Sequence, residues 1–211
     1  MLFRSNFFAL AVNGIESVTM NKNYDTFIYL THESLEREKA VLEHLESGLT
    51  SGLIISVCTG KEGYDHFQQF YENTKLPIVF FDRVPDLLQF PKVISNNYES
   101  TFESTVRLIK AGVKKPLFLG TEQPLYTSIE RRRGFQAALM HYQIPFSDDM
   151  ILDCSDDMDK NYTLIRRLLS SKKRPDGIFA SIEKYAITTY QVCKELKISI
   201  PRDLKIDRKS T

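Results

Sequence analysis

The sequence predicts an α/β protein built on parallel sheets. Along nearly the whole chain of 211 residues, short apolar runs alternate with stretches of helical spacing. The apolar runs carry Ile, Val, Leu and Phe on consecutive positions, which is typical of strands buried on both faces of a sheet. Right-handed crossovers through the intervening helices join such strands.

The expected elements follow one another in a βα rhythm. Strands are predicted at 26–31, 52–57, 77–81, 92–95, 116–120, 150–154 and 176–181. Helices are predicted at 7–18, 34–47, 64–73, 98–111, from 127 onward, at 159–169 and up to 196.

Two sheets are expected rather than one. About seven strands would make a wide single sheet for a chain of this length, and the polar stretch ISNNYES at 94–100 interrupts them. The domain boundary is therefore placed near Asn96. This division gives a first subdomain at 1–96, a second at 97–206 and a tail at 207–211.

Composition excludes several classes of protein. With 42% hydrophobic and 26% charged residues the chain is too apolar to be disordered. The 28 Lys and Arg against 27 Asp and Glu leave a net charge of +1, so no global basic field attracts nucleic acid or a membrane. We find neither a bilayer-spanning apolar run nor a signal peptide, and expect a cytoplasmic protein.

Metal, disulfide and cofactor chemistry are not expected. The three cysteines are odd in number and far apart, which favours reduced thiols packed as small hydrophobes. The four histidines are scattered, and no phosphate-binding or dinucleotide motif is present. No nucleophile stands with a base in a recognisable pattern, so an enzyme is the least favoured class.

One helix start carries unusual positive charge. Thr127 and Glu130 form a capping box, which predicts Thr127 as the N-cap and Arg131 as the fourth helical residue. Arg131 shares a helix face with Phe135 and Leu139. A cation there opposes the helix dipole, so a compensating group is expected nearby.

Arg131 is a candidate ligand-binding residue. The ends of strands and the starts of the following helices line the ligand crevice in open α/β sheets. An arginine there can give forked hydrogen bonds to a carboxylate, a phosphate or sugar hydroxyls. The alternative is an ion pair with a nearby Asp or stacking on Tyr126. Arg132 and Arg133 are expected on a solvated face.

Several segments together resemble the LacI/GalR family of bacterial transcriptional regulators. The segments, in family order and spacing, are LPIVFFDRV, VISNNYEST, LIKAGVKKPLFLG, SIERRRGFQAAL, KRPDGIFASIEKYAI and LKISIPRDL, and the resemblance runs from Phe7 to about Leu204. It implies an α/β fold of two doubly wound parallel-sheet subdomains of periplasmic-binding-protein-like type, which close on a small effector.

The resemblance also implies effector-binding residues. Arg131 matches the family's effector-contacting arginine. Phe7 and Phe8 match the aromatic pair at the start of the family's first helix, where one ring often stacks on the ligand, with core packing as the alternative. Asp82 could accept hydrogen bonds from sugar hydroxyls, or pair with Arg83 instead.

Other positions depart from the family pattern. Ile182 and Glu183 stand where the family has Asn or Ser followed by Asp, so a direct polar contact from position 182 is lost. Val113 replaces a usual His, and Asn96 replaces a usual Asp. These departures leave the identity of the effector open.

The implied function is that of a ligand-sensing core. A LacI-type regulator binds a small sugar or related metabolite and, as a homodimer, passes the subdomain movement to DNA-binding headpieces. The alternative is a periplasmic sugar-binding protein of a transport system, which shares the fold. The resemblance further implies a piece incomplete at both ends, whose first sheet exposes strand edges and apolar surface and whose DNA binding depends on a headpiece absent from this chain.

Overall fold

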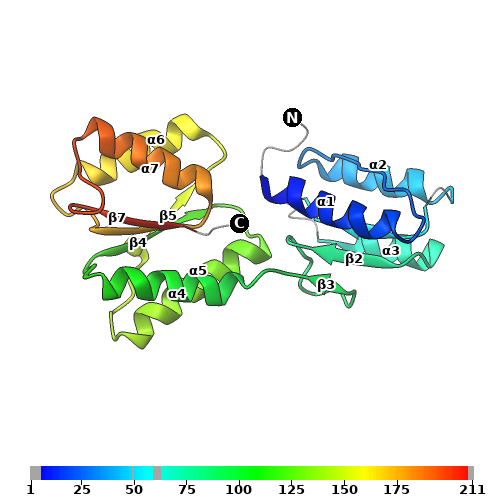
Figure 1. Cartoon of the computed structure of the whole chain (residues 1–211), viewed down its shortest axis with the longest axis horizontal. Helices are drawn as coiled ribbons and strands as arrows, with labels where there is room; N and C mark the ends of the chain where they lie inside the picture. The colour runs from blue at the N-terminus through cyan, green and yellow to red at the C-terminus, as the bar shows by residue number, and fades with distance from the viewer. Residues whose placement is uncertain (1–5, 49, 59–62, 209–211) are drawn as a thin grey trace.

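Two parallel sheets organise the chain in a computed structural model that describes residues 6–48, 50–58 and 63–208 (Figure 1). The first sheet has the order β1-β2-β3 and the second β5-β4-β6-β7, with every neighbouring pair parallel. The described strands are β1 Leu53–Ile55, β2 Ile78–Phe81, β3 Lys92–Val93, β4 Pro116–Thr121, β5 Ile151–Cys154, β6 Gly177–Ala180 and β7 Lys205–Arg208. The predicted α/β class is confirmed.

Helices accompany each sheet in a separate half of the molecule (Figure 1). The first half, α1 to β3, has α1 Asn6–Met20, α2 Leu35–Leu45 and α3 Asp65–Thr74. The second half, α4 to β7, has α4 Asn97–Lys110, α5 Tyr126–His141, a 3-10 turn Asp148–Met150, α6 Met158–Leu169 and α7 Glu183–Glu195. The N-terminal end of α5 lies toward the first half (Figure 1).

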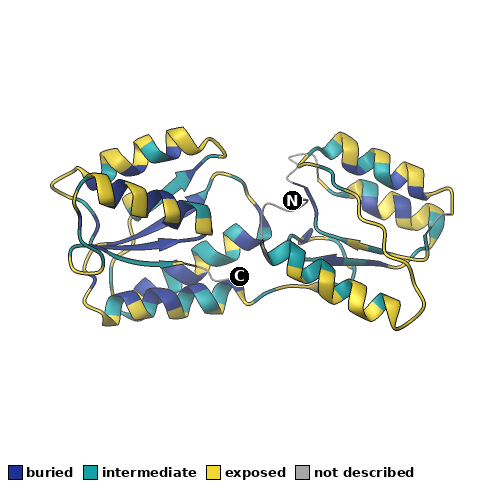
Figure 2. Ribbon diagram, turned by 45° about the horizontal axis from the view of Figure 1, so that its top comes forward, coloured by how far each residue is buried: buried dark blue, intermediate teal, exposed yellow. Residues whose placement is uncertain are grey.

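Aromatic side chains fill the cores of both halves. Phe67 and Phe80 meet edge to face in the first half, with ring centroids 5.1 Å apart. In the second half, Phe118 packs between Phe135 and Phe179. All four residues of β6 are buried, as their consecutive apolar side chains predict for a strand covered on both faces (Figure 2).

Helices α4 and α5 approach closely at Gly134. A Cβ at this position would lie 2.3 Å from the carbonyl oxygen of Tyr98 and 3.1 Å from the backbone nitrogen of Phe102. Only a residue without a side chain allows this backbone contact. The contact fixes α5, and with it Arg131, against the start of α4.

The predicted cap of α5 is wrong. The helix starts at Tyr126 after Leu125, and no side chain caps it. Thr127 is buried inside the first turn, and the Glu130 carboxylate pairs with Arg133 instead of the helix start. Arg131 is consequently the sixth helical residue, deeper in the helix than the capping box predicted.

The strand predicted at 26–31 is also wrong. Residues 24–31 form no regular secondary structure, pair with no described strand and belong to no sheet. Because a strand is stabilised by its ladder of hydrogen bonds, an apolar pattern without a neighbour does not make one. The result is exposed apolar surface, with Phe27 75% accessible. Exposed apolar surface on the first sheet is among the expectations that the resemblance implied.

The sequence missed the edge strand β7. Residues 205–208 pair with β6, so residues 207 and 208 belong to the second sheet and not to a tail. The segment KIDR has one apolar residue, Ile206, and is only partly buried. Such an edge strand lacks the continuous apolar run by which the buried strands were recognised.

Candidate functional site

Arg131 lies on α5 at the side of the second sheet that faces the first half. Strand β4 leads into α5, so the first turns of this helix follow the carboxyl end of a central strand. This is the position where ligands bind in open parallel sheets. The side chain is half-buried.

Two hydrogen bonds orient the Arg131 guanidinium. Its Nε donates to Oδ1 of Asn97 at 2.8 Å, and its Nη1 donates to the carbonyl oxygen of Ser181 at 2.7 Å. Burial lowers the pKa of Arg131, and the charge of Asp82 acts in the opposite direction. A guanidinium has five N–H donors, and these two bonds use one donor on Nε and one on Nη1.

Asp82 approaches from the first half, directly after β2. Its backbone adopts φ +58°, in the left-handed region, and its N–H donates to the carbonyl oxygen of Val93 at 3.0 Å. Aspartate tolerates this conformation better than most residues, and such backbone is common at functional sites. Arg83 binds Glu33, with its Nη1 donating to both carboxylate oxygens. Pairing of Asp82 with Arg83 stays an alternative.

Tyr126 connects the two halves. It is the first residue of α5, and it packs against the core cluster of the first half around Phe67 and Phe80. Burial raises the pKa of the Tyr126 hydroxyl. The start of α5 thus contacts both halves, one turn before Arg131.

Phe7 and Phe8 pack on each other and on the first sheet. Their ring centroids are 5.4 Å apart, and Phe8 lies 5.8 Å from Phe81 of β2. Phe8 also lines a cavity of about 670 Å³ in the first half, which includes neither Arg131 nor Asp82. These contacts match the packing alternative, and ligand stacking by either ring stays a prediction.

Ile182 and Glu183 begin α7. Ile182 precedes the helix and packs against the core of the second half. Glu183 forms an ion pair of 3.1 Å with Arg208 of β7. The residue before them, Ser181, is the one whose carbonyl oxygen holds Arg131.

Asn97 and Ser181 are site residues that sequence reasoning missed. Asn97 is 2% exposed and its side-chain oxygen fixes Arg131. Ser181 is equally buried, and its Oγ has no hydrogen-bond partner in the described structure. Asn97 begins α4 and Ser181 directly follows β6. Such positions at a helix start and a strand end are the signal that could have found them.

The neighbouring arginines behave largely as surface residues. Arg132 pairs with Asp153, and Arg133 with Glu130, the latter with 62% of its side chain exposed. They therefore differ from Arg131, whose partners are a buried amide and a backbone carbonyl.

The cysteines lie away from solvent. Cys58, Cys154 and Cys193 are free and buried, which confirms the prediction of packed thiols. Burial raises the pKa of Cys58 and of Cys154 to about 12, so both stay protonated at neutral pH. In the part of the chain that the structure describes, no three His, Cys, Asp or Glu side chains gather to hold a metal ion. Nor is any described helix long and apolar enough to cross a bilayer.

Two parallel α/β halves that meet beside an oriented arginine define a two-lobed ligand-binding domain. A family model described as periplasmic binding proteins and sugar binding domain of the LacI family matches residues 4–209. The chain belongs to this family.

Named relatives agree with this assignment. The chain is 25% identical over 202 residues to the HTH-type transcriptional repressor PurR of Aliivibrio fischeri, covering 95% of this chain and 59% of that repressor. It is 26% identical to the ribose operon repressor of Haemophilus influenzae, with the same two coverages. The chain thus spans about three fifths of the curated relatives that it matches.

A solved structure supports the fold. A LacI family transcriptional regulator from Enterococcus faecium with bound ribose superimposes with a TM-score of 0.79 at 23% identity. The match covers 98% of this chain and 74% of that regulator.

Proposed function

We propose that this chain is the effector-sensing region of a LacI-type transcriptional regulator, with a small sugar or related metabolite bound between its two halves. The observation that carries the proposal is the fixed guanidinium of Arg131. Asn97 and Ser181 orient it from one half, and Asp82 acts on it from the other.

The side chains of Arg131 and Asp82 together suit a polyol. A sugar hydroxyl accepts a hydrogen bond from a guanidinium and donates one to a carboxylate, so neighbouring hydroxyls can engage Arg131 and Asp82 together. The unpartnered Oγ of Ser181 offers a further polar group. In this proposal Phe7 or Phe8 stacks on the ligand, Ile182 supplies an apolar wall, and Glu183 borders the site.

In this proposal the ligand changes how the two halves are arranged relative to each other. It binds one arrangement more tightly than the other and so changes their populations. In the proposed whole protein, a cytoplasmic homodimer transmits this change to DNA-binding headpieces, and the subdomains divide near residue 96. The named relatives are repressors, which favours regulation over sugar delivery to a transporter and over enzymatic turnover.

Calorimetric titration with a panel of pentoses, hexoses, disaccharides and sugar phosphates tests the proposal. Losing a charge-assisted hydrogen bond costs about 1.5–3 kcal/mol, so Arg131→Ala should weaken binding roughly 10–150-fold. Asp82→Asn keeps the shape and should weaken binding to a smaller extent. Arg133→Ala, two positions along the same helix, is the matched control and should bind as the parent does.

Circular dichroism accompanies each titration, because Arg131 also binds Asn97 and Ser181. Unchanged affinity in a folded Arg131→Ala protein would remove this residue from the site. Equal losses in the Arg131 and Arg133 variants would equally contradict the proposal.

A further inference from the structure

The edge of the second sheet at which its strands begin carries a dense group of cations. Parallel strands all begin at one edge, so the segments before β4, β6 and β7 lie side by side, at the end of the second half that points away from the first (Figure 1). These segments are 111–115, 170–176 and 196–205. They hold eight Lys and Arg against two carboxylates, a net charge of +6 in a chain of net charge +1. We call these cations the basic edge: Lys114, Lys115, Lys172, Lys173, Arg174, Lys197, Arg202 and Lys205.

Hydrogen bonds of Asp176 hold the three segments together. Its carboxylate accepts from the N–H of Lys114 at 3.0 Å and from the N–H of Lys115 at 2.7 Å. Its carbonyl oxygen accepts from the N–H of Lys205 at 3.0 Å. Arg174 lies two positions before it in the chain. Cations of all three segments are therefore fixed close to one residue.

Helix ends explain other cations nearby, but not the basic edge. Helices α4, α6 and α7 end here, and basic residues in a last turn offset the negative end of a helix dipole. The residues in such positions are Arg107, Lys110, Arg166, Arg167 and Lys194. The basic edge lies beyond the helix ends. Of its eight cations, seven form no ion pair with any described residue, and Arg202 pairs with Asp203 at 3.1 Å.

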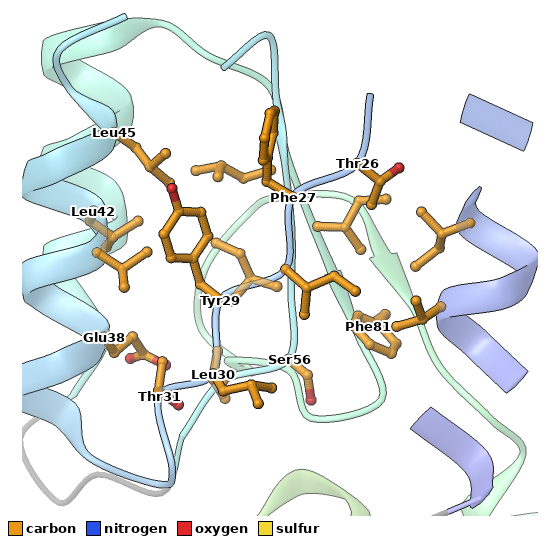
Figure 3. A pocket seen from close by; sticks show the side chains of 18 of the residues that line it. Thr26, Phe27, Tyr29, Leu30, Thr31, Glu38, Leu42, Leu45, Ser56 and Phe81 are labelled. Atoms are coloured by element: carbon orange, nitrogen blue, oxygen red, sulfur yellow. The ribbon is translucent and has the colours of Figure 1, made fainter. Parts of the chain in front are cut away.

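The surroundings of the basic edge indicate a polyanion as its partner. None of the large hydrophobic side chains exposed on the described chain lies in the three segments. Phe27, for example, lies beside the cavity of the first half (Figure 3). Protein interfaces have an apolar and aromatic centre from which Lys is depleted. Stable binding to a lipid surface needs an inserted apolar group besides basic residues. The basic edge offers neither.

From these observations we propose that the basic edge binds a linear polyphosphate chain. Six of its eight cations are lysines, which contact phosphate as point charges without fixing its orientation. Adjacent strands lie about 4.8 Å apart, so the three segments spread over only about 10 Å across the sheet. A flexible chain of phosphates can follow all three. The fourth loop of this edge, before β5, carries Asp148 and Asp149 and no Lys or Arg, so the surface ends at β4.

Other polyanions fit the basic edge less well. Duplex DNA is stiff over about 50 nm, so it touches loops at the end of a domain at few points. Single-stranded nucleic acid gains much of its binding from bases stacked on aromatic side chains, and the three segments contain no aromatic residue. The carboxylates of an acidic peptide pair best with the planar fork of Arg, whereas this surface is mostly Lys. Polyphosphate needs neither stacking nor a planar fork.

Calorimetric titration of the whole chain with short-chain inorganic polyphosphate tests the proposal. Release of counterions makes the logarithm of the association constant fall linearly with the logarithm of salt concentration, by about 0.7 per phosphate neutralised on a flexible strand. With about four cations engaged, the slope should be about −3, and affinity should fall roughly 60-fold between about 50 and 200 mM KCl. Inorganic triphosphate is too short to reach all three segments and should bind at least about tenfold more weakly.

Two double variants locate the site. Lys172→Ala combined with Lys173→Ala removes two exposed cations of the basic edge. It should change the salt slope from about −3 to about −1.5 and weaken binding by about tenfold or more. Lys22→Ala combined with Lys160→Ala is the matched control, because it changes the net charge equally at exposed positions after α1 and in the first turn of α6. The control should bind as the parent does, and circular dichroism should show both variants folded.

Three results would overturn the proposal. Equal losses in the two double variants would show a response to net charge rather than to this surface. Triphosphate binding as tightly as polyphosphate would show that the three segments do not act together. Tighter binding of duplex DNA or of a polyglutamate peptide at the same salt concentration would assign the surface to that partner. None of these measurements involves Arg131 or Asp82, so they test the basic edge separately from the proposed sugar site.

Discussion

Replacing Gly134 with alanine tests how the second half positions Arg131. The new methyl group would lie 2.3 Å from the carbonyl oxygen of Tyr98, whereas ordinary contacts of a Cβ begin near 3.4 Å. The atoms that it meets first are backbone atoms of α4, which cannot rotate away as a side chain could. The two helices must therefore separate by about 1 Å.

Two opposing effects set the change in the free energy of unfolding. Alanine is better than glycine inside a helix by about 1 kcal/mol. Overpacking against fixed atoms costs about 1–3 kcal/mol and occasionally more, and contact with backbone belongs at the upper end of this range. We expect Gly134→Ala to lower the free energy of unfolding by about 1–2 kcal/mol in total.

Urea unfolding followed by circular dichroism measures this change. Gly14→Ala is the matched control, because a Cβ at Gly14 in α1 meets nothing within 4 Å. That variant should raise stability by about 0.4–1 kcal/mol. A Gly134→Ala protein as stable as the parent would refute the close approach of α4 and α5.

The remaining predictions concern two carboxylates and two buried thiols. The Glu38 carboxylate accepts a hydrogen bond from the N–H of Cys58 at 2.8 Å and binds His66 at 2.9 Å. Glu38→Ala should therefore lower the free energy of unfolding in urea by about 1–3 kcal/mol. An unchanged free energy of unfolding would show that these bonds are dispensable. The raised pKa values of Cys58 and Cys154 mean that, between about pH 9 and 12, the folded state holds protons that the unfolded state loses. Stability should fall with rising pH in that window and not below it, and Cys154→Ala should make the slope shallower; an equal slope would contradict burial as the cause. Asp176 accepts from two consecutive backbone N–H groups before β4, so Asp176→Ala should lower stability in urea by about 1–3 kcal/mol, whereas Asp176→Asn, which retains one oxygen, should lose less.

The sequence by itself determined the alternation of strands and helices and the order of the two halves. Strands such as β4 and β6 are buried on both faces, so each consists of consecutive apolar residues that can be read locally. The segments that resemble the LacI/GalR family also pointed to Arg131. These features depend on residues close together in the chain.

Only the tertiary structure decided which apolar runs pair as strands, where α5 begins and which groups orient Arg131. The apolar run at 26–31 forms no strand, because no described strand pairs with it. Its apolar composition alone does not make it a strand. The partners of Arg131 lie 34 and 50 residues away, at Asn97 and Ser181. Hydrogen bonds across such separations arise from the packing of whole elements, which no local pattern specifies.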